Sequence, residues 1–223
     1  MFFLLACWTM TLPLITPWTG SQKRVENRGA FGIAAGGWRG RFSPDMKPTL
    51  LRDYQGHPCE GFLMSEKLDG WRMMWTGSEF ISREGNVFDA PAWFKKGMPA
   101  IALDGELFAG RGEFNSIQAR ISAGWRGLTF QVFDAPEMVA PFKARYKFLQ
   151  YVNLPAHASL VRQERCRDTK HLLDAADGIV AAGGEGMVVR DPRAMYQAGR
   201  THDVLRWVPQ CPTINRRKSA AVA

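Results

Sequence analysis

The apolar residues between positions 48 and 209 come in short runs that glycine, aspartate and asparagine interrupt. Runs of this length suit β-strands better than helices, and only a few stretches have the spacing of an amphipathic helix. We expect strands at residues 61–67, 71–75, 79–82, 101–108, 129–134, 186–190 and 203–208. We expect helices at residues 113–123, 142–153 and 168–182. This mixture predicts an α+β domain.

The rest of the chain differs in composition from this central part. We expect an apolar extension and a Gly/Arg-rich linker at residues 1–45, the α+β domain at 46–209 and a basic tail at 210–223. No charged residue precedes Lys23, so the basic region that opens a signal peptide is missing. Pro13 and Pro17 argue against a spanning helix. We therefore expect a cytoplasmic protein without a membrane span, and a periplasmic one as the alternative.

The chain carries a formal charge of +8, which favours polyanionic partners such as nucleic acids or nucleotide phosphates. Its four cysteines are Cys7, Cys59, Cys166 and Cys211. None forms a CxxC pair or has a nearby histidine at metal-ligand spacing, which argues against a zinc site. We expect free thiols in a reducing compartment.

The stretch SEKLDGWR places Lys67 between apolar runs, where strand and burial are expected. Gly70 permits a tight turn after the lysine, which puts the amine at a strand end close to apolar walls. Burial and neighbouring positive charge both favour the neutral amine, and that amine is a nucleophile able to attack phosphorus. The alternative is a lysine that serves only in a salt bridge.

Two further strands carry acids where strand interiors disfavour them. LDGEL places Asp104 and Glu106 on either side of a glycine, and Glu185 opens the strand of GGEGMVVR. Acid-bearing strands with basic residues at their margins fit one cleft that binds a metal and a phosphorylated ligand. The alternative is a set of separate structural ion pairs.

Five segments resemble, in order and spacing, the motifs of the ATP-dependent DNA ligases, a family of lysine-dependent nucleotidyltransferases. They are KLDGWR at 67–72, SREGN at 82–86, LDGEL at 103–107, FD at 133–134 and EG at 185–186. The resemblance spans about residues 43–209, and it is strongest to the minimal bacterial and phage ligases. Five motifs in order are far more specific than any one of them.

The resemblance implies an adenylation domain in which helices flank antiparallel sheets, a nucleotidyltransferase fold related to ATP-grasp. It implies that Lys67 attacks ATP to form lysyl-AMP, that AMP passes to the 5′-phosphate of nicked double-stranded DNA, and that the 3′-hydroxyl then seals the nick. Such enzymes serve DNA repair, replication and recombination. We expect a monomer, which would act in the host cytoplasm if a phage encodes it.

The resemblance also assigns roles to individual residues. Lys67 is the catalytic nucleophile. The ATP-binding residues are Glu66, Lys67, Arg72, Glu106, Phe133 and Arg206, with Glu66 at the adenine edge, Glu106 at the ribose and Phe133 stacked on the base. Arg83 contacts the 5′-phosphate of the nick. Glu185 and Glu106 hold Mg²⁺ or Mn²⁺.

The chain departs from the family pattern at its last strand, where the family carries a KxK motif. Arg206 stands at the first lysine and Val208 at the second. Arginine keeps the charge without the point-like geometry of lysine, and valine keeps neither. We expect slower adenylyl transfer unless Arg190, Arg200 or a basic residue of the tail substitutes.

The 14 residues after Pro209 leave no room for the C-terminal OB-fold domain of these ligases. We therefore expect the adenylation domain alone, which a separate DNA-binding partner could complete. Basic residues outside the domain could supply phosphate contacts, namely Lys23, Arg24, Arg39, Arg41, Arg216, Arg217 and Lys218.

Two alternatives stay open. The same chemistry could serve RNA ligation or RNA capping. The protein could also be a degenerate module that binds nicks or nucleotides without turnover, since the last motif is altered. Covalent AMP on Lys67 distinguishes the second alternative from an active enzyme.

Overall fold

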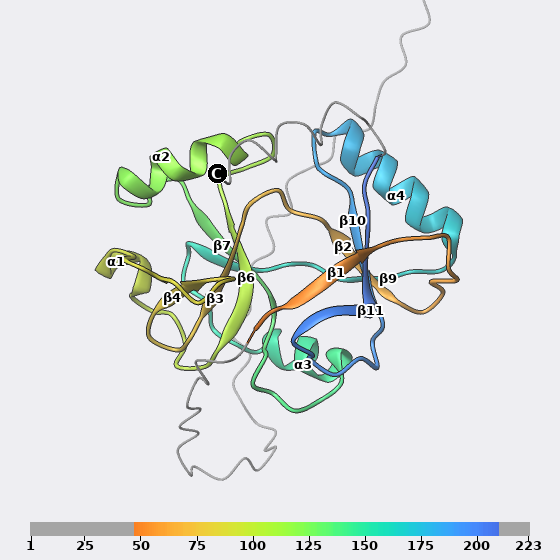
Figure 1. Ribbon diagram of the computed structural model, residues 1–223, viewed down its shortest axis with the longest axis horizontal. Coiled ribbons are helices and arrows are strands. Elements are labelled where there is room, and N and C mark those ends of the chain that lie inside the picture. The colour runs from red at the N-terminus through yellow and green to blue at the C-terminus, as the bar shows by residue number, and fades with distance from the viewer. Residues whose placement is uncertain (1–46, 210–223) are drawn as a thin grey trace, which may run out of the picture. The chain divides into compact units, whose positions relative to one another are not determined.

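The computed structural model describes residues 47–209 and forms two β-sheets with a few short helices (Figure 1). The first sheet has the strand order β1-β11-β10-β2-β9. Its strands are β1 (Thr49–Asp53), β11 (Gly199–Trp207), β10 (Met187–Arg190), β2 (Leu63–Glu66) and β9 (Glu164–Arg165). The second has the order β5-β4-β3-β6-β7-β8. Its strands are β5 (Val87–Phe88), β4 (Phe80–Ser82), β3 (Trp71–Trp75), β6 (Leu103–Phe108), β7 (Thr129–Asp134) and β8 (Ala158–Leu160).

The expected α+β class is confirmed, but the expectation of antiparallel sheets is wrong in one pair of each sheet. β1 runs parallel to β11, and β7 runs parallel to β8. Both parallel pairs involve strands that the sequence did not predict. β1, β5, β8 and β9 are edge strands of two to five residues, so none has a long apolar run. Their pairing with a distant strand therefore decides their conformation.

The helices are α1 (Ala92–Lys95), α2 (Ile117–Ser122), α3 (Phe142–Leu149) and α4 (Thr169–Ala181), with a 3₁₀ turn at Phe114–Ser116 before α2. The three expected helices are present, each shorter than predicted, and α1 was not expected. α4 begins where the Asp168 carboxylate accepts a hydrogen bond from the His171 amide at 2.7 Å. Its apolar face packs on β2 and β10 (Figure 1).

Each sheet has its own hydrophobic core. The first core cluster lies on the second sheet and is rich in aromatic rings, including Phe80, Phe94, Trp125 and Phe130. The second core cluster lies between the first sheet and α4, and it contains Met64, Leu172, Ala176, Met187, Val189, Leu205, Cys59 and Cys166. Since residues of β2 and β10 belong to this second cluster, the packing of α4 fixes β2, which leads to Lys67, together with its neighbour β10.

A buried ion network connects the two sheets. Asp134, at the end of β7, accepts hydrogen bonds from Arg145 of α3 and from Arg190 of β10. The three side chains are 1%, 2% and 10% exposed. Arg145 also donates to the carbonyls of Ala140 and Ala194. One carboxylate thus joins the second sheet to the first through Arg190 and to α3 through Arg145.

Two glycines of the predicted motifs allow strands to approach closely. Gly70 lies at a bend before β3, as expected, but its φ is not left-handed. A Cβ there would come within 2.4 Å of the Leu107 carbonyl oxygen, so close approach to β6 excludes a side chain. Gly186 has a φ of +148°, and a Cβ there would come within 2.2 Å of the Trp207 carbonyl oxygen.

Several expectations fall on residues that the structure does not describe. The extension and linker at 1–45, the tail at 210–223, Cys7 and Cys211 lie outside the described residues. So do the basic residues Lys23, Arg24, Arg39, Arg41, Arg216, Arg217 and Lys218. Between residues 47 and 209, no helix is long and apolar enough to cross a bilayer.

Candidate active site

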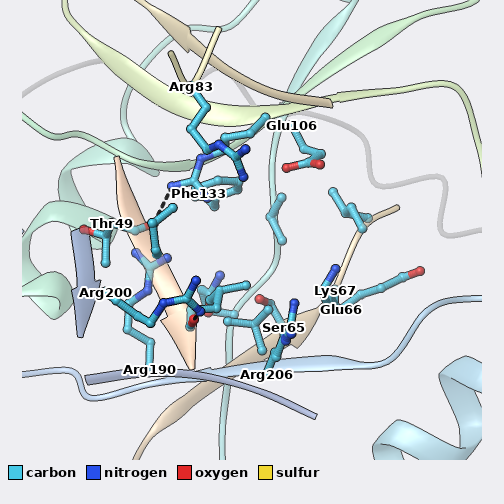
Figure 2. Close-up of a pocket in the computed structure, with 17 residues that line it drawn as sticks. Thr49, Ser65, Glu66, Lys67, Arg83, Glu106, Phe133, Arg190, Arg200 and Arg206 are labelled. Atoms are coloured by element: carbon cyan, nitrogen blue, oxygen red, sulfur yellow. Dashed lines mark hydrogen bonds between the residues drawn. The ribbon is translucent and has the colours of Figure 1, made fainter. Parts of the chain in front are cut away.

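A pocket of about 240 Å³ is lined by residues of both sheets (Figure 2). Arg83, Glu106 and Phe133 enter it from the second sheet and its β4–β5 turn, and Lys67, Arg190, Arg200 and Arg206 enter from the first sheet. Seven of the eight predicted site residues line it, namely Glu66, Lys67, Arg72, Arg83, Glu106, Phe133 and Arg206. The eighth, Glu185, contacts Lys67. The tertiary structure therefore brings together all eight residues that the motifs selected.

Lys67 directly follows β2, opposite the segment that opens β10. The register pairs Glu66 with Met187, and the Lys67 amide donates to the Gly186 carbonyl at 2.8 Å. The Lys67 ammonium nitrogen lies 2.5 Å from Glu185 Oε2, and each side chain is 15% exposed. The sequence suggested either a nucleophile or a salt-bridged lysine, and the lysine is in a salt bridge at the wall of a pocket. Because the pair is partly exposed, a ligand in the pocket can reach the amine.

Glu106 lies on β6 directly opposite Arg72 on β3. Burial raises the pKa of its carboxyl from 4.5 to about 7, although the charges of Arg72 and Lys67 oppose the rise. Near neutral pH the group is therefore divided between its carboxylate and its carboxylic acid. The acid form can donate a hydrogen bond, and the carboxylate can accept one from a ligand hydroxyl or bind a cation.

This pKa predicts a pH-dependent stability. Because the folded-state pKa of Glu106 lies above its value of 4.5 in the unfolded chain, its protonation favours the folded state. The contribution is complete below pH 4.5 and is lost as the pH rises through about 7. We expect the free energy of unfolding of the native chain to fall relative to that of Glu106→Gln over this interval. Urea unfolding of both proteins at constant ionic strength measures the difference.

The partly exposed Glu113, which pairs with Arg120, supplies a control for the Glu106 measurement. Glu113→Gln should follow the pH dependence of the native chain. Parallel curves for the native chain and Glu106→Gln across this range would contradict the raised pKa.

Arg72 is held in place by Asp104, an acid to which the ligase motifs assign no role. Its Nε and Nη2 each lie 2.6 Å from an oxygen of Asp104, which is fully buried. Tyr196 donates to the same carboxylate at 2.6 Å. Because this bidentate pair uses two donors of the Arg72 fork, its orientation is fixed by Asp104. An acid within an apolar strand marked Asp104 in the sequence, whereas nothing there marked Tyr196.

The Phe133 ring lies in the pocket among guanidinium groups. The Arg72 guanidinium carbon is 4.5 Å from the ring centroid, and that of Arg190 is 5.8 Å away. These cation–π contacts orient the ring without filling the pocket. Its stacking on an adenine base stays a prediction.

The other arginines of the pocket differ in how firmly they are held. Arg190 is bound to buried Asp134, so it is less available as a substitute for the missing lysine than the sequence suggested. Arg200 donates to the Leu51 carbonyl at 3.1 Å, and Arg206 pairs with Asp53 at 2.6 Å. Arg83 is 59% exposed and pairs with its neighbour Glu84. Val208 is not among the residues that line the pocket.

Glu66 is engaged by an arginine that the sequence did not select. Arg111 Nε and Nη2 lie 2.7 and 2.8 Å from the two Glu66 oxygens, and Arg111 Nη1 donates to the Ala182 carbonyl at 3.3 Å. The adenine-reading role predicted for Glu66 would therefore require the carboxylate to exchange or share this partner. Arg111 lies in a loop after β6, and no local sequence pattern connects that loop to β2.

Glu106 and Glu185 were predicted to hold a divalent cation. Among residues 47–209, no cluster of three or more His, Cys, Asp or Glu side chains could hold a metal ion. Glu185 pairs with the Lys67 amine. The charge of Lys67 lowers the pKa of Glu106 and the charge of Glu185 raises it, so the three groups interact electrostatically. Magnesium is commonly bound by one or two carboxylates together with substrate phosphates, and this donor set fits that mode.

Sequence comparison finds a DNA ligase of Haemophilus influenzae that is 35% identical over 165 residues. The alignment covers 70% of this chain and 61% of that ligase, so the chain spans less than two thirds of its length. No protein-family model matches the chain.

Structure comparison finds DNA ligases as well. The structure of a Lig E DNA ligase has a TM-score of 0.69 and 28% identity, and the match covers 74% of this chain and 69% of that one. The Chlorella virus DNA ligase-adenylate matches with a TM-score of 0.61 and 18% identity, over 73% of this chain and 68% of that one. The ATP complex of the bacteriophage T7 ATP-dependent ligase matches with a TM-score of 0.55 and 13% identity, over 76% and 70%. The last two show the fold alone. The chain is therefore similar to DNA ligases in sequence, and to ATP-dependent DNA ligases in motif order and fold.

Proposed function

We propose that residues 46–209 form the nucleotidyltransferase domain of an ATP-dependent DNA ligase, which takes AMP onto Lys67 and passes it to nicked double-stranded DNA. The observation that carries this proposal is the Lys67 amine, which lies beside Glu185 at the wall of an arginine-rich pocket. Relatives of this chain are DNA ligases by sequence and by structure.

In the first step, the Lys67 nitrogen attacks the α-phosphorus of ATP. An N–P bond forms, the bond to the bridging oxygen breaks, and pyrophosphate leaves. The ammonium must lose its proton first, and Glu185, at 2.5 Å, is the base positioned to accept it. Negative charge that develops on the phosphoryl oxygens would be stabilised by the pocket arginines, of which Arg200 and Arg206 are partly exposed.

The remaining pocket residues would orient the nucleoside. Glu106 accepts hydrogen bonds from the ribose hydroxyls in its carboxylate form, and Phe133 offers an aromatic surface to the base. Arg72 keeps the Phe133 ring in place from its anchor on Asp104. Glu66 reads the adenine edge once Arg111 shares or releases its carboxylate.

Glu185 and Glu106 would hold a magnesium or manganese ion against the phosphates. The ion would neutralise negative charge on the α-phosphate and on the leaving pyrophosphate.

In the second step, a 5′-phosphate oxygen of the nick attacks the lysyl-AMP phosphorus, the N–P bond breaks and the Lys67 amine leaves. In the third step, the 3′-hydroxyl attacks the phosphorus of the nick 5′-phosphate, and AMP leaves. Arg83 is the arginine of the pocket that suits the DNA phosphate, because its side chain is 59% exposed. The formal charge of +8 favours the approach of the polyanion. A separate partner could add to the grip on the duplex.

Labelling tests the first step directly. The purified chain is incubated with α-labelled ATP and Mg²⁺, denatured, separated by electrophoresis and mapped by peptide. We expect the label on Lys67 and its absence from Lys67→Ala. Lys95→Ala is the matched control, since Lys95 pairs with Glu79 outside the pocket and should leave labelling unchanged.

A chase with nicked duplex tests the later steps. The label should leave the protein and appear on the nick 5′-phosphate, and a sealed strand should follow. Preference for a nick with RNA strands would favour the RNA-ligase alternative. A folded chain that binds nicked DNA but takes no label would contradict the proposal and favour the degenerate binding module, which Val208 in the last motif also suggests.

A further inference from the structure

Two cysteines that the proposed function does not use meet in the second core cluster. The sulfur atoms of Cys59 and Cys166 lie 3.3 Å apart, although the residues are 107 positions apart in the sequence. Both are buried, at 1% and 0% exposure, and both carry free thiols in this structure. Neither lines the pocket.

Backbone hydrogen bonds hold the two cysteine segments side by side. The Cys166 amide donates to the Phe62 carbonyl at 2.7 Å, and the Gly61 amide donates to the Cys166 carbonyl at 2.8 Å. The Phe62 amide donates to the Cys59 carbonyl at 3.0 Å. These hydrogen bonds continue the pairing of β2 with β9 beyond the ends of the two strands. The backbone itself therefore keeps the two sulfurs close together.

We propose that Cys59 and Cys166 are a disulfide-forming pair, which closes to an intramolecular bond when the chain meets a disulfide oxidant. The sulfurs must approach from 3.3 Å to about 2.05 Å. One thiolate attacks the oxidant to form a mixed disulfide and releases one thiol. The second cysteine sulfur then attacks the mixed disulfide and releases another, so two protons and two electrons pass to the oxidant.

The burial of the pair decides when the bond can form. Thiolates are the reactive species, and burial raises the pKa of the Cys166 thiol. Exchange in the closed native state should therefore be slow. The bond should form readily while the chain folds, before the second core cluster excludes the oxidant.

The position of the bond defines its effect. It would join the segment that leads into β2 to the segment between β9 and α4, and β2 leads directly to Lys67. A crosslink that closes a loop of this length removes much conformational freedom from the unfolded chain. The oxidised protein should therefore be more resistant to unfolding than the reduced one.

The test uses the full chain with Cys7→Ser and Cys211→Ser, so that only the two core cysteines remain. The protein is unfolded, then refolded either with a mixture of oxidised and reduced glutathione or with excess dithiothreitol. It is denatured without reductant and treated with a maleimide reagent. We expect two reactive thiols after dithiothreitol and none after glutathione, a Cys59–Cys166 crosslinked peptide, and a monomer on a non-reducing gel.

Thermal unfolding of the same samples measures the consequence. The oxidised sample should unfold several degrees above the reduced one, and Cys59→Ser or Cys166→Ser should remove the difference. Two reactive thiols after oxidative refolding, or crosslinks only between chains, would overturn the pairing. An intramolecular bond with no rise in the unfolding temperature would overturn the stabilising role.

Discussion

Lys67→Arg should lose all covalent labelling by α-labelled ATP, down to background, while the protein stays folded. Arginine keeps the positive charge opposite Glu185, so the ion pair at the pocket wall can be retained. Its guanidinium remains protonated at any accessible pH and offers no free electron pair to phosphorus. The substitution therefore separates the charge of residue 67 from its nucleophilicity.

The measurement compares Lys67→Arg with the native chain and with Lys95→Arg, in the same labelling assay and at equal folded fraction by circular dichroism. Lys95 pairs with Glu79 away from the pocket, so its arginine variant should label normally. Labelled Lys67→Arg would show that another residue carries the AMP, and the proposed chemistry would then be wrong.

Asp134→Asn should destabilise the fold by about 3–5 kcal/mol, the usual cost when one partner of a buried ion pair is removed. Asp134 binds Arg145 and Arg190, and both guanidinium groups are almost entirely buried. An asparagine cannot neutralise either charge. Arg190 belongs to the first sheet and Asp134 to the second. Loss of their ion pair should therefore weaken the connection between the two sheets that line the pocket.

Urea unfolding of Asp134→Asn against the native chain measures this effect. Asp174→Asn is the control, because Asp174 pairs with Lys170 on the exposed face of α4 and should change stability far less. Equal stability of Asp134→Asn and the native chain would contradict the role of the network. A protein that fails to fold at all agrees with it.

The sequence predicted the strands that carry the motifs more fully than the strands that complete the sheets. β2, β3, β6, β7 and β10 were expected because each is an apolar run bounded by breakers. β1 was missed although it supplies Thr49 and neighbouring residues to the pocket wall. Two of its five residues, Arg52 and Asp53, are charged, so its apolar run is short. It becomes a strand because it pairs with β11, which lies at the other end of the domain sequence.

The site shows the same division. The resemblance to the ligase motifs selected Lys67, Glu106 and Phe133, and the structure brings these residues to one pocket. The sequence could not show that Asp104 orients Arg72, that Arg111 forms an ion pair with Glu66, or that Asp134 binds Arg190. Each of these pairs joins residues more than 30 positions apart. A charged residue in a sequence does not reveal which distant partner it will meet.

The sequence by itself determined the α+β class, the strands that carry chemistry and the residue types that can serve as nucleophile, acid and phosphate binder. These depend on local periodicity and on residues placed where strands disfavour them, so they can be read along the chain. Only the tertiary structure decided the parallel pairings of the edge strands, the partners of the buried charges and the meeting of Cys59 with Cys166. These depend on contacts between distant segments, which form only when the two cores close.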